Sequence, residues 1–380
     1  MTTSLQQNSN SDTSTKPLLK PGFLSLSRHE WADLSISLGI PAYRGSQIAD
    51  WIFKKFATSV DAMTNLNRDL KQHLSDHLDW KIPECVSELQ SDDGSTKLLL
   101  KTAAGQFIES VILRYENRVT LCVSSQVGCK MACSFCQTGK LGFFRNLSTH
   151  EILAQFVFAQ RILNAEGRRL SHVVFMGMGE PLDNYANVVK SVKILTSPDG
   201  YGLSNRHVTI STSGVVPKIA ELANDVKCAL AISLHASRND LRDELMPINR
   251  KWPLEQLKDS LIQYQQTTGQ KITLEYILIK DKTSGIREAK ELVKFIHGLQ
   301  AKVNLIPFNS HPGLPYDRPS ADEIRAFQEY LAERSIASPV RYSKGLDVSA
   351  ACGQLAAKTI HSVDAAPERK RVIGIEPSLT

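Results

Sequence analysis

The chain has 380 residues, of which 42% are hydrophobic and 22% are charged, with a formal net charge of +6. This composition is typical of a globular protein with two or three domains and excludes a fibrous or wholly disordered chain. No stretch approaches the roughly 18 apolar residues of a membrane span, and the polar N-terminus shows no secretory signal. We therefore expect a cytoplasmic protein whose mild positive charge permits an RNA partner but does not require one.

The N-terminal part of the chain is predicted to be helical after a disordered tail. Residues 1–22 are mostly polar, which predicts the tail. Residues 23–82 have the apolar spacing of a small helical accessory domain. Ser27 and Ser46 are candidate caps for its first two helices, and a third helix covers residues 66–78. The basic residues of this domain, which can contact RNA phosphates or form an ordinary solvated face, are Arg44, Lys54, Lys55 and Lys71.

Residues 83–120 are predicted to form a β extension that leads into the main domain. Short β-rich runs alternate there with turn signals, which indicates antiparallel strands. The runs cover residues 86–89, 97–101, 107–113 and 119–123.

Residues 121–357 are predicted to form the core domain, because strand-like runs alternate with helical stretches. Alternating βα units indicate an α/β fold with a parallel sheet, and periodicity alone leaves open whether that sheet closes. In such folds the chemistry lies at the carboxyl ends of the strands. Residues 358–380, which include a basic cluster, are predicted to be a tail that is either loose or in contact with RNA. The strand-like runs cover residues 172–175, 207–211, 229–234, 272–279, 303–308 and 338–342.

Three closely spaced cysteines are the strongest chemical signal in the sequence. Cys129, Cys133 and Cys136 have the spacing C-x3-C-x2-C. Structural zinc sites use four ligands, usually as two separated pairs, whereas three thiolates in one loop suit an iron–sulfur cluster with one iron left open. A zinc loop completed by a ligand elsewhere is the alternative. The odd total of seven cysteines argues against a disulfide framework, and Cys85 and Cys228 are expected to be small buried hydrophobic residues.

The cysteine loop resembles the cluster loop of the radical S-adenosylmethionine (SAM) superfamily. The resemblance implies a 4Fe-4S cluster held by the three cysteines, with SAM bound to the remaining iron. A glycine-rich segment containing Gly179 and Glu180 resembles the SAM-binding segment of the same superfamily. Glycines let a backbone approach a ligand closely, and a carboxylate can accept from an ammonium group. Further strand-end residues are candidates for SAM binding, namely Ser211, Ser233, Leu234, His235 and Asn309.

The sequence also carries longer motifs, at residues 117–129, 142–147, 176–182, 208–217, 229–236 and 350–355. These motifs resemble the RlmN/Cfr family of RNA methyl synthases, and the resemblance runs over residues 24–357. The resemblance implies a mechanism in which Cys352 takes a methyl group from one SAM. A second SAM, so two per turnover, is cleaved to a 5′-deoxyadenosyl radical, the S-methyl group loses a hydrogen, and its carbon adds to adenine. Cys122 then resolves the protein–RNA adduct and leaves a Cys122–Cys352 disulfide. Glu109 matches the proton acceptor of the family, and Cys122 is the alternative base.

The same resemblance implies a fold and a substrate. It implies a partial (β/α)6 barrel that methylates C2 of an adenosine in 23S rRNA and of a tRNA adenosine beside the anticodon. It also implies a monomer with an electron donor such as flavodoxin or ferredoxin. Methylation of C8, as in the Cfr branch, is one alternative. A radical SAM enzyme for a peptide or small molecule and a non-enzymatic metal-binding RNA module are the others. Segments 140–144 and 344–347 depart from the commonest RlmN forms and leave the RNA range open.

Overall fold

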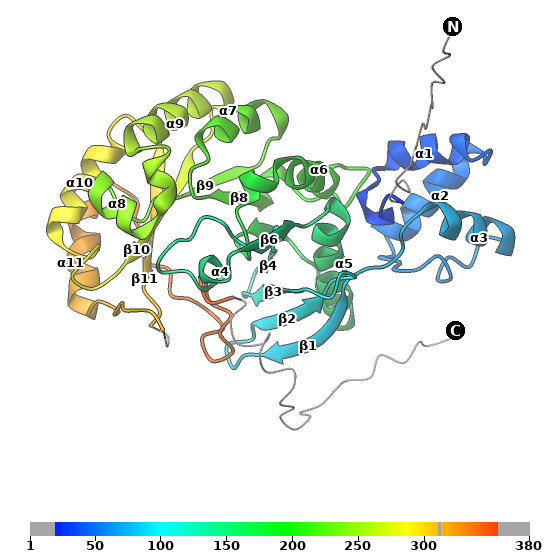
Figure 1. The fold of residues 1–380 in the computed structure, drawn as a ribbon, viewed down its shortest axis with the longest axis horizontal. Coiled ribbons are helices and arrows are strands. Elements are labelled where there is room, and N and C mark those ends of the chain that lie inside the picture. Colours follow the sequence, from blue (N-terminus) through cyan, green and yellow to red (C-terminus); the bar gives the residue numbers. More distant parts are fainter. Residues whose placement is uncertain (1–19, 311–312, 356–380) are drawn as a thin grey trace, which may run out of the picture.

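The computed structural model describes residues 20–310 and 313–355 and places a nine-stranded sheet at the centre of the molecule (Figure 1). Its strands are β1 (Glu84–Gln90), β2 (Thr96–Lys101), β3 (Phe107–Arg114), β4 (Val119–Cys122), β7 (His172–Phe175), β8 (Val208–Thr212), β9 (Ala229–Ser233), β10 (Ile272–Leu278) and β11 (Ala301–Pro307). They lie in the order β1-β2-β3-β4-β7-β8-β9-β10-β11. The two end strands are not paired with each other, so this sheet is open.

The sheet changes from antiparallel to parallel pairing at β4. Strands β1 to β4 pair antiparallel, whereas β4, β7, β8, β9, β10 and β11 pair in parallel. Parallel strands in an open sheet, separated along the chain by helices, confirm the predicted α/β fold with a partial (β/α)6 barrel. The strand-like run at residues 338–342 forms only an isolated bridge between Leu305 and Val340. Pro339 has no N–H to donate to a longer ladder.

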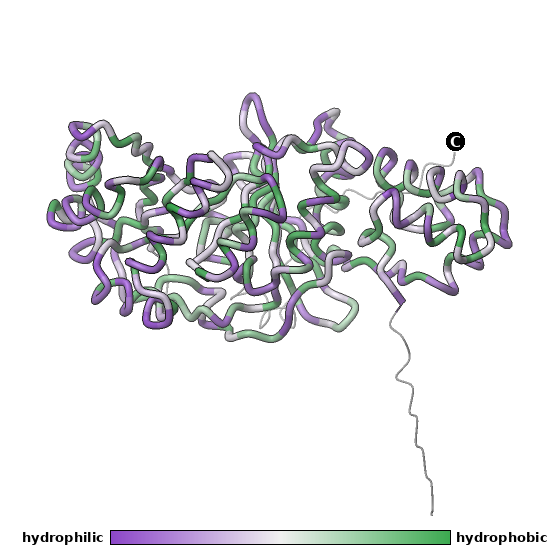
Figure 2. The backbone as a smooth tube through the Cα atoms, turned by 90° about the horizontal axis from the view of Figure 1, so that it is seen from above, coloured by the Kyte–Doolittle hydropathy of each residue, from purple (hydrophilic) through white to green (hydrophobic). Residues whose placement is uncertain are grey.

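Helices separate the parallel strands along the chain and cover the outer side of the sheet (Figure 1). They are α5 (Thr149–Ala165), α6 (Tyr185–Thr196), α7 (Val216–Asp225), α8 (Asn239–Leu245), α9 (Leu254–Thr268), α10 (Ile286–Ile296) and α11 (Ala321–Ala332). Figure 2 shows hydrophobic segments in the middle of the molecule and hydrophilic segments on its outer helices and loops. One face of the parallel strands is apolar and fully buried, as shown by Val173, Ile210, Ile232 and Leu274.

A short hairpin encloses the cysteine loop and was not predicted. Strands β5 (Gln126–Gly128) and β6 (Phe143–Asn146) pair antiparallel, with the short helix α4 (Gln137–Lys140) between them. Gly128 has a φ of +74°, and a Cβ atom there would lie 2.0 Å from the carbonyl oxygen of Gly142. The N–H of Cys129 donates to that same carbonyl oxygen across 2.8 Å. Only glycine at position 128 therefore permits the close approach that closes the hairpin.

The N-terminal helices α1 (Arg28–Ser37), α2 (Ala42–Phe53) and α3 (Arg68–His77) lie at one end of the molecule (Figure 1). Ser27 caps α1 through a reciprocal capping box with Glu30, as expected. The expectation that Ser46 caps the second helix is wrong: α2 already begins after Pro41, so Ser46 lies inside it. The fixed φ of proline favours a helix start directly after it.

Aromatic side chains join this helical region to the core. Phe56 stacks on Tyr201 at a centroid distance of 5.9 Å, and Phe156 of α5 lies 4.6 Å from the same ring. Such contacts bury large apolar areas. The predicted N-terminal tail lies outside the described residues up to residue 19, and the predicted C-terminal tail, residues 358–380, lies wholly outside them. None of the described helices combines the length and apolar character needed to cross a membrane.

Candidate active site

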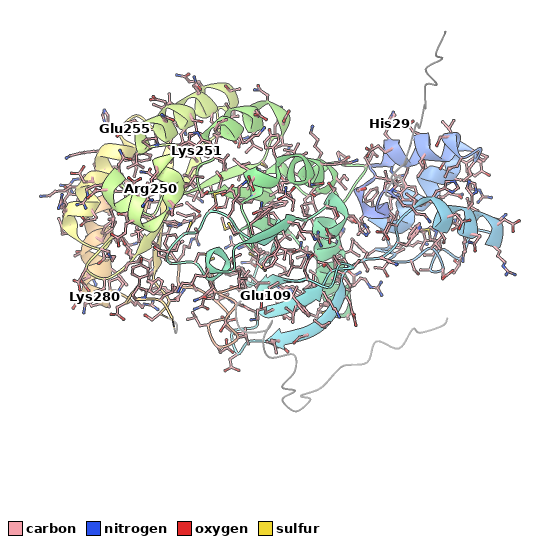
Figure 3. All side chains as sticks on the ribbon, viewed as in Figure 1. His29, Glu109, Arg250, Lys251, Glu255 and Lys280 are labelled. Atoms are coloured by element: carbon pink, nitrogen blue, oxygen red, sulfur yellow. The ribbon has the colours of Figure 1, made fainter. Side chains whose placement is uncertain are left out.

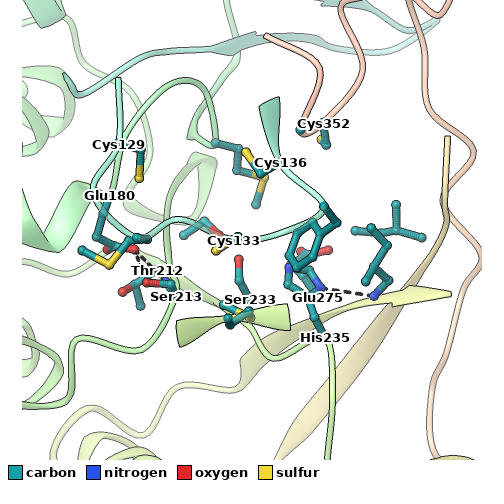
Figure 4. Close-up of a pocket in the computed structure, with 18 of the residues that line it drawn as sticks. Cys129, Cys133, Cys136, Glu180, Thr212, Ser213, Ser233, His235, Glu275 and Cys352 are labelled. Atoms are coloured by element: carbon teal, nitrogen blue, oxygen red, sulfur yellow. Dashed lines mark hydrogen bonds between the residues drawn. The ribbon is translucent and has the colours of Figure 1, made fainter. Parts of the chain in front are cut away.

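The three cysteines of the C-x3-C-x2-C motif line one cavity together with Cys352 (Figure 4). The cavity encloses about 1090 Å³, counted out to its open mouth. It lies at the carboxyl ends of the parallel strands, where α/β folds place their chemistry. Most of the SAM-binding residues predicted from the sequence also line it, namely Gly179, Glu180, Ser211, Ser233, His235 and Asn309.

The chemistry of the three cysteines fits a multi-iron cluster better than a single ion. Burial raises the pKa of Cys129 to about 12. Burial and then the neighbouring thiols Cys136 and Cys129 raise the pKa of Cys133. Three thiolates are therefore unfavourable here without a compensating cation. Within the described residues, no three His, Cys, Asp or Glu side chains converge on one ion position. A cluster in which each thiolate binds a different iron matches that spread.

Strand register explains why polar side chains gather in the cavity. Residues paired across a sheet point to the same face, and the next residue along each strand points to the other. Ser211 pairs with Ala231, and Ser233 pairs with Glu275. Glu275 in turn pairs with Asn304. These residues share the inner face of the sheet, opposite the apolar face that packs against the helices.

The glycine-rich segment after β7 positions Glu180. Gly179 has a φ of +105°, and a Cβ atom there would lie 2.6 Å from Cβ of Gln126. The Glu180 carboxylate accepts from the N–H of Ser213 at 2.7 Å and from its hydroxyl at 2.8 Å. It also accepts from the N–H of Leu182 at 3.0 Å. These hydrogen bonds fix the orientation of the carboxyl group at the cavity wall, while burial raises the pKa of Glu180.

His235 is held as a neutral hydrogen-bond donor. Its Nδ1 atom accepts from the N–H of Ile277 at 3.1 Å, so the ring proton lies on Nε2. Burial, and then the charge of Arg242, lower the pKa of His235 to about 3. The ring meets Phe135 edge-on at a centroid distance of 4.9 Å. Leu234, by contrast, is fully buried and does not line the cavity, so the structure does not bring its side chain into the site.

Sequence reasoning missed two buried residues of the site: Glu275, which lines the cavity, and Arg242, which supports the segments that line it. Glu275 accepts from Nδ2 of Asn304 at 2.9 Å, and burial raises the pKa of Glu275. The feature of the sequence that could have revealed Glu275 is a lone carboxylate inside the apolar run of residues 272–279. Arg242 of α8 donates to the carbonyl oxygens of Ser213 at 2.7 Å and Leu234 at 3.1 Å. This guanidinium thereby links the segments that follow β8 and β9.

Cys352 lies on a C-terminal segment, residues 343–355, that is fastened at both ends. Near its start, the N–H of Gly345 donates to the Asp93 carboxylate at 2.7 Å. Near its end, Gly353 accepts from the N–H of Gln137 at 2.8 Å. Burial among surrounding atoms, and then the charge of Glu275, raise the pKa of Cys352 to about 11. Its side chain is nevertheless exposed, because it lies at the mouth of the open cavity.

Cys122 and Glu109 lie beside the cavity rather than in its wall. Cys122 is buried at the end of β4, and burial followed by the charge of Cys352 raises the pKa of Cys122. Both cysteines are free thiols. Glu109 lies on β3 (Figure 3), where its carboxylate pairs with the ammonium group of Lys97 at 3.2 Å. Of the two cysteines expected outside the site, Cys228 is buried and Cys85 is half-buried.

Comparison with known proteins adds to this geometry. Residues 123–296 match the radical SAM superfamily, and residues 22–79 match the ribosomal RNA large subunit methyltransferase N-terminal domain. The chain is 43% identical over 335 residues to the probable dual-specificity RNA methyltransferase RlmN of Dictyoglomus turgidum, covering 88% of this chain and 96% of that protein. It is 44% identical over 346 residues to the dual-specificity RNA methyltransferase RlmN of Campylobacter fetus, covering 87% and 97%. The crystal structure of a radical SAM methyltransferase from Sphaerobacter thermophilus superposes with a TM-score of 0.86 at 42% identity, covering 88% of this chain and 98% of that chain.

Proposed function

Because the chain belongs to the RlmN family of radical SAM RNA methyltransferases, we propose that it methylates C2 of adenosine in 23S rRNA and in tRNA. The observation that carries this proposal is the pair Cys122 and Cys352. Cys352 lines the cavity of the cysteine loop, and Cys122 lies at the end of β4, on the face of the sheet that carries the cavity residues. A radical SAM enzyme for a small molecule has no evident need for two further thiols at this place.

Membership of the superfamily implies a 4Fe-4S cluster and SAM, and we assign the cluster to Cys129, Cys133 and Cys136. When bound, the cluster and SAM supply a 5′-deoxyadenosyl radical that removes a hydrogen atom from a methyl group. Neutral His235 offers its Nε2 proton to SAM. The glycine backbone at Gly179 permits close approach of the ligand. The strand-end groups of Ser211, Ser233 and Asn309, together with the buried Glu180, line the same cavity and would orient the polar atoms of SAM.

Cys352 provides the nucleophile that adenine lacks. C2 of adenine is an electron-poor amidine carbon, so it does not attack the methyl group of SAM directly. In the proposed first step the Cys352 thiol loses its proton, its sulfur bonds to the methyl carbon, and S-adenosylhomocysteine leaves. A second SAM is therefore consumed in the radical step, which gives two per turnover. The exposure of Cys352 at the cavity mouth allows access to both SAM and RNA.

Cys122 and Glu109 act after the methylene carbon has bonded to the RNA. We assign removal of the C2 proton to Glu109, with Cys122 as the alternative base. The adduct gives up its unpaired electron, which the cluster would accept. The Cys122 thiolate then attacks the sulfur of Cys352, and the electron pair of the sulfur–carbon bond stays on the methylene carbon. That carbon takes a proton to become the methyl group, and a Cys122–Cys352 disulfide remains. Cellular thiols must reduce that disulfide before the next turnover. We further propose that the enzyme works as a cytoplasmic monomer with flavodoxin or ferredoxin as its electron donor.

Nucleoside mass spectrometry tests the proposal. The protein is reconstituted anaerobically with iron and sulfide, then given SAM, a reductant, and unmodified 23S rRNA or tRNA in separate reactions. We expect 2-methyladenosine in both, its loss in Cys352→Ala, and its retention in Cys85→Ala, which removes a thiol outside the cavity. Formation of 8-methyladenosine would overturn the regiochemistry. Cleavage of SAM to 5′-deoxyadenosine without any RNA methylation would overturn the assignment of substrate.

A further inference from the structure

Lys97 and Glu109 form an ion pair inside the sheet, close to Cys122. The Nζ atom of Lys97 lies 3.2 Å from Oε1 of Glu109, and the two side chains are 8% and 2% exposed. Lysine and glutamate are almost never buried this deeply unless they are paired. Apolar side chains of similar volume are often as stable in such a position. The presence of charges here therefore indicates a role in chemistry rather than in stability.

The register of the sheet places this pair on the face that lines the cavity. Lys97 lies opposite Val111, and Val111 lies opposite Cys122 in the next strand pair. Glu109 precedes Val111 by two residues, so its side chain points to the same face. Cys122 lies opposite Val174 of β7, on the face that carries the cavity residues. The polar side chains of three adjacent strands thus follow one another in the order Lys97, Glu109, Cys122.

Charged and titratable groups flank Glu109 on the neighbouring strands. Among the described residues, the titratable groups that share its face on the flanking strands are Lys97 and Lys101 from β2 and Cys122 from β4. On the opposite face, α5 presents the uncharged amide of Gln155 to the neighbouring residue of β3. Lys344 of the C-terminal segment donates to carbonyl oxygens at the edge of β1 to β3 instead. Lys97 is paired with the Glu109 carboxylate at 3.2 Å, whereas Lys101 lies at the exposed end of β2.

We propose that Lys97 is a positioning residue for RNA methylation, which keeps Glu109 ionised inside the sheet so that its carboxylate can take the proton from C2 of the adenine adduct. The inference rests on the proposed role of Glu109. The proton moves from C2 to a carboxylate oxygen of Glu109, and the electron pair of the C–H bond stays in the purine. An ammonium group at this distance favours the ionised form of a carboxyl that burial would otherwise protonate.

Infrared spectroscopy of the wild-type protein tests the charge of Glu109 directly, without RNA or turnover. The difference between wild type and Glu109→Gln isolates the signal of this one side chain. We expect an ionised carboxylate throughout the neutral range. In Lys97→Met, which keeps the length of the side chain but not its charge, we expect the midpoint of protonation to rise by about one to three pH units. Lys97→Arg should keep the midpoint at the wild-type value, because arginine keeps the positive charge.

Lys101→Met is the matched control, because Lys101 lies at the exposed end of the same strand and on the same face. A protonated Glu109 in the wild type at neutral pH, or equal midpoints in wild type and Lys97→Met, would overturn the proposal. The wild-type measurement decides even if Lys97→Met does not fold.

Single-turnover methylation then connects the charge to the reaction. We expect the acid limb of the pH–rate profile for 2-methyladenosine formation to move upward in Lys97→Met by the same amount as the infrared midpoint. Lys97→Arg and Lys101→Met should follow the wild-type profile. A uniform loss of rate at every pH would mean a merely structural role and would contradict the inference. If the wild type methylates no RNA, the proposed function fails, while the infrared midpoints still decide whether Lys97 sets the charge of Glu109.

Discussion

The backbone N–H of Gln137 donates to the carbonyl oxygen of Gly353 across 2.8 Å. Gln137 follows the last cysteine of the loop, and Gly353 follows Cys352. The Thr138 hydroxyl adds a second bond, to the carbonyl oxygen of Leu355 at 3.1 Å, across 217 residues of sequence. These contacts hold the fourth cavity cysteine against the cysteine loop. Changes in either segment are therefore expected to affect the other.

Gly128→Ala is expected to prevent iron loading of the cysteine loop. A Cβ atom at position 128 would lie 2.0 Å from the carbonyl oxygen of Gly142, so the hairpin must open and Cys129 must move. We expect the iron bound per chain after anaerobic reconstitution to fall severalfold. Gly142→Ala is the control, because its φ is +73° but no atom lies within 4 Å of the added Cβ. Its strain is about 1–2 kcal/mol, and equal iron contents in the two variants would contradict the prediction.

Arg242→Met is expected to loosen the ends of β8 and β9. The variant leaves the buried carbonyl oxygen of Ser213 and the side-chain oxygen of Asn249 without the donor that Arg242 supplies, and each unsatisfied group costs about 1–3 kcal/mol. We expect the free energy of unfolding in urea to fall by about 2–4 kcal/mol. SAM affinity should fall as well, because Ser213 also holds Glu180. Arg250→Met, at an exposed position, is the control. Coinciding unfolding curves for the two variants would show that Arg242 does not stabilise the ends of β8 and β9.

Asp93→Asn is expected to release the segment that carries Cys352. Burial acts to raise the pKa of Asp93, but hydrogen bonds from Ser95 and from the N–H of Gly345 outweigh it and lower the pKa to about 2. Because the folded pKa lies below the ordinary value of 3.8, the stabilisation is complete above about pH 4 and is lost as the pH falls toward 2.

Hydrogen–deuterium exchange of residues 343–355 at pH 7 should be faster in Asp93→Asn than in wild type. Asp92→Asn, a change on the same turn, should leave exchange near the wild-type rate. In urea unfolding, the difference between wild type and Asp93→Asn should shrink as the pH is lowered from 7 to 2.5. A difference that grows at low pH would have the wrong sign for a depressed pKa.

Cys122→Ala is expected to trap the protein on its RNA substrate. Without the second thiol, the bond between the Cys352 sulfur and the adenine-linked carbon cannot be exchanged for a disulfide. A denaturing gel of the single-turnover reaction should show a covalent protein–RNA species. The double variant Cys122→Ala, Cys352→Ala should show none. Release of methylated RNA by Cys122→Ala at the wild-type rate would remove Cys122 from the mechanism.

The sequence predicts the elements that are determined locally. The apolar run at residues 172–175 matches β7 (His172–Phe175) to the residue. Ser27 caps α1 because a serine followed by a glutamate three residues later satisfies two N–H groups at once. The prediction that Ser46 caps the second helix is wrong, because α2 already begins after Pro41. The hairpin of β5 and β6 was not predicted because its strands have only three and four residues, too few to show an alternating pattern.

The contacts that connect distant strands could not be predicted in the same way. The pair of Lys97 with Glu109 depends on the register of β2 against β3, and a shift of one residue would send the two side chains to opposite faces. Arg242 is satisfied by carbonyl oxygens of other segments, and no residue type marks those acceptors. Leu234 lies beside His235 in sequence, yet its side chain points into the core. Motif spacing thus finds the neighbourhood of a site, and strand register determines which side chains enter it.

The antiparallel strands β1 to β3 and the parallel strands belong to one continuous hydrogen-bonded sheet. Glu109 lies on β3, which precedes the cysteine loop in the sequence, whereas Cys352 lies near the C-terminal end of the chain. Residues 83–120 supply none of the residues that line the cavity, yet they carry Glu109 and provide the strand that pairs with β4. Loss of hydrogen-exchange protection in β2 is accordingly expected to spread to β4 as one cooperative unit. Substitutions within residues 83–120 are therefore expected to lower activity even when the three cysteines of the loop are unchanged.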